Sequence, residues 1–76
     1  MELNEFIANF ASQFDETELD VFSASTEFKE LDEWSSLIAL SVIAMVDEEY
    51  DVTLKGDDIT ESKTIEELFN KVCSKK

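Results

Sequence analysis

The sequence predicts a small all-α bundle of three to four helices, with a long first loop and a short third helix. Apolar residues recur at helical spacing in three segments, 2–14, 36–50 and 65–72. The chain has no proline and a single glycine, which disfavours turn-rich β architectures. Its 76 residues fit one domain, residues 1–76, which is large enough for one core and has a thin margin of stability.

The first expected helix covers residues 2–14. Its apolar stripe consists of Leu3, Phe6, Ile7, Phe10, Ala11 and Phe14. Glu2 and Glu5 lie in the first turn, where carboxylates interact favourably with the positive end of a helix. The apolar spacing and the acidic first turn therefore both predict this helix.

Residues 15–34 show no sustained period and predict a long connection that crosses the end of the bundle. The apolar side chains expected to hold this connection are Leu19, Val21, Phe22, Phe28, Leu31 and Trp34. A short helix at residues 25–30, with Ser25 as its cap, is possible within it. Long connections of this kind often carry function.

The helix over residues 36–50 has two apolar stripes. The inner stripe comprises Ala39, Ile43, Val46 and Tyr50, flanked by Val42. The second stripe comprises Leu37, Leu40, Ser41, Ala44, Asp47 and Glu48. A bundle of this size has too few helices to cover both, so the second stripe is a candidate docking surface. The alternative is a core helix that is covered on all sides.

The C-terminal part is expected to begin with a connection over residues 51–58, turning at Lys55 and Gly56. Asp58 has the spacing to start a single helical turn. Thr64 and Glu67 form a capping box that opens the last helix. The inner stripe of that helix is Ile65, Leu68, Phe69 and Val72.

The net charge is −13, and residues 1–54 hold 14 acids against one base, Lys29. Such a surface repels nucleic acids and anionic lipids, so neither is an expected partner. It attracts proteins with basic patches, although excess acid also simply keeps a small protein soluble.

The residue types needed for most catalysis are missing. The sequence has no histidine, the usual general base and the commonest metal ligand, and no glycine-rich phosphate loop. The single cysteine, Cys73, excludes an internal disulfide and is expected to be a bystander. We therefore expect no enzyme and no metal site. The chain also has no leader and no membrane-spanning apolar run, which points to a cytoplasmic protein.

Ser36 is the candidate functional residue. It begins a helix, where backbone N–H groups and the helix dipole suit an attached anion such as a phosphodiester. The competing interpretation is that Ser35 and Ser36 are only helix caps, and these physical arguments alone favour it.

The assembled pattern resembles the acyl carrier protein family. The resemblance rests on Ser35-Ser36-Leu37, then on the acidic helix end 47–50, then on the Thr64 helix start, and it covers nearly the whole chain. It implies that Ser36 carries 4′-phosphopantetheine, transferred from coenzyme A by a phosphopantetheinyl transferase. Acyl groups would ride on this arm as thioesters, and the protein would be a monomeric carrier rather than an enzyme.

The resemblance also implies how partners bind. The expected partner-binding residues are Leu37, Leu40, Ala44, Asp47 and Glu48, which match the family's contact positions, together with Ser35. Partners would be basic-surfaced acyl-transfer, ketosynthase or acyl-ligase enzymes of fatty-acid or specialised polyketide pathways. The sequence departs from the family at Ser35, where Asp is usual, and at Trp34, Ile38 and Ser41. The alternative function is an unmodified acidic adaptor that docks partners through the same helix.

Overall fold

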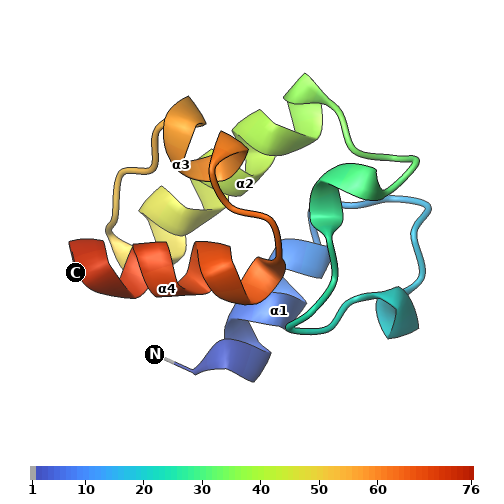
Figure 1. The fold of residues 1–76 in the computed structure, drawn as a ribbon, viewed down its shortest axis with the longest axis horizontal. Helices are drawn as coiled ribbons and strands as arrows, with labels where there is room; N and C mark the ends of the chain where they lie inside the picture. The colour runs from blue at the N-terminus through green and yellow to red at the C-terminus, as the bar shows by residue number, and fades with distance from the viewer. Residues whose placement is uncertain (1) are drawn as a thin grey trace.

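The computed structural model describes residues 2–76, which form four α-helices and two 3-10 turns without a strand (Figure 1). The elements are α1 Leu3–Ala11, η1 Leu19–Val21, η2 Phe28–Glu30, α2 Ser36–Tyr50, α3 Gly56–Thr60 and α4 Ile65–Lys75. Helix α1 packs against both α2 and α4, and α3 packs against α4. The predicted all-α bundle, with its long first connection and short third helix, is confirmed.

The core consists largely of aromatic and branched side chains from every helix. Its fully buried members are Phe6, Phe10, Phe28, Val42, Val46, Ile65, Leu68 and Val72. The Phe6 ring contacts Tyr50 of α2 and Phe69 of α4, with centroids 5.8 and 5.4 Å apart. This ring therefore joins the three longer helices, and such aromatic contacts add to the gain from burial.

Helix α1 ends three residues earlier than predicted. The Asn9 carbonyl accepts hydrogen bonds from the Ser12 hydroxyl at 2.7 Å and from the Gln13 side chain at 3.1 Å. The Gln13 N–H turns instead to the Phe10 carbonyl, which closes a tighter turn. Side chains that bond nearby carbonyls compete with the helical ladder in this way. Phe14 remains buried beyond the helix end.

The first connection differs from its prediction in two respects. Phe22 and Phe28 are buried as expected, but Leu19 and Val21 in η1 are 73% and 44% exposed. The predicted helix at 25–30 is only the turn η2, and Ser25 does not cap it. The Thr26 hydroxyl organises the segment instead, because it accepts from the Ser23 N–H and donates to the Val21 carbonyl.

Backbone hydrogen bonds fasten this connection to the start of α4. The N–H groups of Ile65 and Glu66 donate to the carbonyls of Thr26 and Ala24, at 3.1 and 3.0 Å. The first N–H groups of a helix have no partner inside the helix, so the connection satisfies two of them. A long loop is thereby held on the body of the bundle.

Helix α2 begins and ends at the predicted residues. It is buried through Val42, Met45, Val46 and Tyr50, of which Met45 was not assigned to the inner stripe. Ala39 and Ile43, which were assigned to that stripe, are only half-buried. Both line a groove described below.

The start of α3 differs from its prediction, whereas α4 is capped by the predicted residue. Helix α3 begins at Gly56 rather than at Asp58, whose carboxylate accepts from the Lys55 N–H at 2.9 Å. This hydrogen bond, with a smaller contribution from the Lys75 ammonium, lowers the pKa of Asp58. The Thr64 hydroxyl caps α4 as predicted, accepting from the Glu67 N–H.

The Glu67 carboxylate forms the second bond of this helix start. It accepts at 3.0 Å from the N–H of Lys63, which is the residue before the N-cap. The Thr64 half of the predicted capping box is therefore confirmed, but the carboxylate of Glu67 accepts from the Lys63 N–H and not from the Thr64 N–H.

Candidate functional site

Ser36 is the first residue of α2, and its side chain is exposed. The preceding Ser35 is the N-cap: its backbone is extended, and its hydroxyl accepts from the Ile38 N–H at 3.3 Å. The capping role thus falls to Ser35. An exposed hydroxyl at the first helical position lies beside N–H groups that favour an attached phosphate.

The segment that leads to this serine is held by the Glu33 carboxylate. It accepts hydrogen bonds from the N–H groups of Asp15, Glu16 and Thr17 and from the Thr17 hydroxyl. The Asp15 bond is the largest cause of a pKa for Glu33 below its usual range, against a partly opposing desolvation. Two distant parts of the first connection are therefore tied together next to the α2 start.

Trp34 is the second fixed point before Ser36. Its ring stacks on Phe10 at 4° between planes and packs edge-on against Phe28, with centroids 5.0 Å apart. Phe14 also contacts it at 6.3 Å. The ring is half-buried, so one part rests on the core while another part remains accessible.

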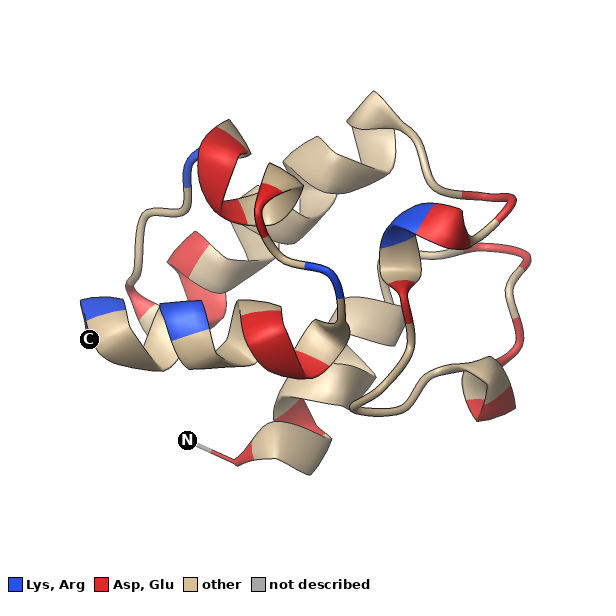
Figure 2. Cartoon of the chain, viewed as in Figure 1, with Lys and Arg blue, Asp and Glu red and all other residues tan. Residues whose placement is uncertain are grey.

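The outer face of α2 is accessible along its whole length. Leu37 and Leu40 are 74% and 62% exposed and lie one helical turn apart, so they form one apolar patch on the surface. The exposed predicted partner-binding residues are Ser35, Leu37, Leu40, Ala44, Asp47 and Glu48. Figure 2 shows acidic positions at the far end of this helix and the lysines mostly on the C-terminal third of the chain. The helix is therefore not covered on all sides.

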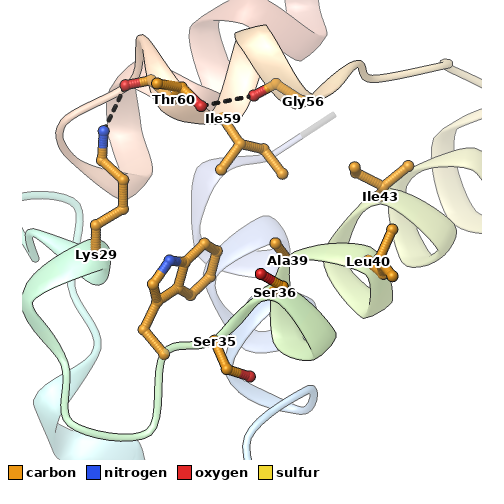
Figure 3. A pocket seen from close by; sticks show the side chains of 10 residues that line it. Lys29, Ser35, Ser36, Ala39, Leu40, Ile43, Gly56, Ile59 and Thr60 are labelled. Carbon is orange, nitrogen blue, oxygen red and sulfur yellow. Dashed lines mark hydrogen bonds between the residues drawn. The ribbon is translucent and has the colours of Figure 1, made fainter.

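A groove of about 590 Å³ opens directly beside Ser36 (Figure 3). Its lining residues come from η2, α2 and α3 and from the segment before α2; they are Lys29, Trp34, Ser35, Ser36, Ala39, Leu40, Ile43, Gly56, Ile59 and Thr60. Figure 3 shows the Ile59 side chain pointing from α3 toward α2. The Lys29 ammonium reaches across to donate to the Thr60 carbonyl at 2.5 Å.

The sequence predicted an accessible serine at the start of α2 and an uncovered outer face, and both are exposed, but it did not predict the groove. Lys29, Ile59 and Thr60 lie far apart in the chain, and no local pattern joins them. One signal was present: Lys29 is the only base in the first 54 residues. An isolated cation in an acidic segment is a candidate for a specific electrostatic contact.

The arrangement fits a phosphodiester-linked prosthetic group. An exposed hydroxyl supplies an attachment atom, the α2 N-terminus suits the phosphate, and the adjoining groove offers apolar side chains to what is attached. Among residues 2–76, no helix is both long enough and apolar enough to span a membrane.

Comparison with known protein families also indicates a phosphodiester-linked prosthetic group. The model of the phosphopantetheine attachment site matches residues 4–72. Neither the curated proteins nor the solved structures contain a match to the chain. Since the matched region covers nearly the whole chain and the fold is the expected helical bundle, the protein belongs to the phosphopantetheine attachment family, consistent with an acyl carrier protein that bears covalently attached 4′-phosphopantetheine.

Proposed function

We propose that the protein is an acyl carrier protein whose prosthetic group is attached to Ser36. The observation that supports this residue is its position: it is an exposed serine at the first position of α2, beside the groove and inside the matched region. When bound, phosphopantetheine supplies a thiol that carries acyl groups as thioesters. The protein itself contributes attachment, shelter and a surface for partner enzymes.

Attachment is a transfer from coenzyme A on a phosphopantetheinyl transferase. The Ser36 hydroxyl oxygen bonds to the phosphorus that bears pantetheine, and the phosphoanhydride bond to the nucleotide breaks. Adenosine bisphosphate leaves, and the serine proton passes to a base of the transferase. This chain has no histidine, so it depends on the partner for that base.

Partners are expected to bind the outer face of α2. The exposed Leu37 and Leu40 provide apolar contact near Ser36, and Asp47 and Glu48 provide negative charge at the other end of the helix. A basic partner surface complements this face and is steered toward it by the net charge of −13. Acyl-transfer, ketosynthase and acyl-ligase enzymes of fatty-acid or specialised pathways fit this description. We expect the carrier itself to be a monomer that works in the cytoplasm.

The test is the intact mass after incubation with coenzyme A and a broad-specificity phosphopantetheinyl transferase. We expect the mass of one phosphopantetheine to be added to the wild type and to Ser35→Ala, but not to Ser36→Ala. The neighbouring serine is the matched control, because both substitutions remove one exposed hydroxyl. A mass gain that persists in Ser36→Ala would overturn the assignment.

The second candidate is an unmodified adaptor that docks through α2. The exposure of Leu37 and Leu40 supports it, because an exposed apolar face serves a binding partner whether or not a prosthetic group is attached. Partner capture that is lost in Ala44→Arg and retained in Ser36→Ala, together with no mass gain in the wild type, would favour the adaptor.

A further inference from the structure

Aromatic side chains of the core lie behind the groove beside Ser36. Trp34 forms part of its wall, and the ring is held from behind by Phe10, Phe14 and Phe28. Ile59 adds a side chain that is 4% exposed. Well-packed rings of this kind leave no room for a chain to pass between them without repacking. An acyl group that the arm on Ser36 folds back into the groove therefore lies along the groove and ends among the residues at its rim.

Lys29 is the one cationic side chain among the described residues that line the groove. The Lys29 ammonium has three N–H donors and uses one for the Thr60 carbonyl, which positions it above the groove. The Thr60 hydroxyl in turn donates to the Gly56 carbonyl, so the α3 side of this contact is itself held. Within residues 2–76 the ammonium has no second hydrogen-bond or ion-pair partner, which leaves two donors for a group that enters the groove.

The charge around Lys29 makes this position distinctive. Lys29 is the only base among the first 54 residues, which also carry 14 acids. An anionic group near Ser36 is repelled by that surface and finds compensating charge at Lys29. A neutral alkyl end gains nothing from the ammonium, and it leaves the two remaining donors to water.

We propose that the groove selects acyl groups that end in a carboxylate, with the apolar part of the chain against Trp34 and Ile59 and the carboxylate on the Lys29 ammonium. This assignment rests on the proposed attachment at Ser36 and adds the substrate class. Because the groove is open to water, the ion pair weakens with salt.

The experiment uses the tryptophan already in the wall, the only one in the chain. The transferase is supplied with hexanoyl coenzyme A or adipoyl coenzyme A, whose acyl groups have equal carbon number and differ only in the terminal carboxylate. Acrylamide quenching of Trp34 fluorescence then measures how well each group covers the groove. We expect adipoyl loading to protect Trp34 more than hexanoyl loading, and added sodium chloride to reduce the difference.

Variants assign the effect to the ammonium. Lys29→Met keeps approximately the length of the side chain without its charge. In this variant, adipoyl loading is expected to protect Trp34 no more than hexanoyl loading does; the extra protection expected in the wild type is the adipoyl advantage. Lys29→Arg is expected to retain it. Lys63→Met is the matched control, because it removes one exposed lysine charge outside the groove. Circular dichroism of each loaded variant verifies that the helices are intact.

The outcomes separate the two proposals. Equal protection by both acyl groups in the loaded wild type would overturn the carboxylate assignment while leaving attachment at Ser36 in place. An adipoyl advantage that survives in Lys29→Met would also overturn it, because the carboxylate would then bind elsewhere. Absence of any mass gain on incubation would overturn the proposed function and this inference together.

Discussion

Glu33 and Thr17 are joined by two hydrogen bonds to one carboxylate oxygen: Glu33 Oε1 accepts from the Thr17 N–H at 2.9 Å and from its hydroxyl at 2.8 Å. With the N–H groups of Asp15 and Glu16, these bonds fasten the beginning of the first connection to its end. The tie lies three residues before Ser36, so it contributes to how the start of α2 is presented.

The first prediction is that Glu33→Gln lowers stability at neutral pH and has little effect in acid. The native hydrogen bonds lower the pKa of Glu33, with the Asp15 bond as the largest cause. A lowered native pKa means that the stabilisation is present above the unfolded pKa of about 4.3 and is lost as the pH falls through the native pKa. Melting temperatures of wild type and variant across this range measure the effect.

Glu30→Gln is the control for this prediction. It removes the same charge from an exposed side chain in η2. Loss of a negative charge alone would raise the melting temperature of so acidic a chain. A Glu33→Gln melting curve that followed Glu30→Gln at every pH would contradict the role given to the Glu33 hydrogen bonds.

The second prediction concerns the cap of α2. Ser35→Ala removes the acceptor for the Ile38 N–H and is expected to cost about 1 kcal/mol of unfolding free energy, as N-cap losses do. Ser35→Asp keeps an acceptor and adds a charge that suits the helix dipole, so it is expected to be more stable than Ser35→Ala. Urea unfolding measures both.

The same pair of variants tests partner recognition. An aspartate at position 35 restores the charge usual in the acyl carrier family and is expected to increase kcat/KM of a broad-specificity phosphopantetheinyl transferase, through attraction of its basic surface. A transferase rate that is equal for Ser35→Asp and Ser35→Ala would show that this charge is not sensed.

The sequence predicted α2 well for a local reason. Ser35 supplies a cap and the following residues sustain a long apolar helix, so both signals lie within one segment. The end of α1 was predicted wrongly because the Ser12 and Gln13 side chains take the Asn9 carbonyl, a competition that apolar spacing does not record. Periodicity reports which face is buried more reliably than where a helix stops.

The groove was beyond prediction for a different reason. It requires η2, α2 and α3 to meet, and their approach depends on packing of the whole bundle. Ala39 and Ile43 illustrate this: their spacing assigned them to the core, but the short α3 leaves them partly open to the groove. Exposure of Leu37 and Leu40 was predictable, since one small bundle cannot cover a helix that is apolar all round.

The third prediction is that salt stabilises the fold. Folding brings the 14 acids of residues 1–54 together with only one base among them, so their repulsion opposes compaction. Both sodium chloride and magnesium chloride are expected to raise the melting temperature through screening. A melting temperature that stays flat as either salt is added would contradict a large repulsive contribution.

The last prediction compares one substitution at two leucines. Leu68→Ala removes a fully buried side chain of α4 and is expected to cost about 2–5 kcal/mol, through lost burial and the cavity left behind. Leu40→Ala acts on a side chain that is 62% exposed, so its stability change is expected to stay within about 0.5 kcal/mol. Urea unfolding of the two variants checks both values.

The same two variants are expected to affect the transferase reaction for different reasons. Leu40→Ala should lower kcat/KM for the transferase although the carrier remains folded, because Leu40 lies on the face proposed to bind partners. Any loss in Leu68→Ala should follow its unfolded fraction and recover when the temperature is lowered toward maximal stability. If Leu40→Ala were both stable and fully active, Leu40 would not contribute to transferase binding, and the exposed apolar surface would need a different partner.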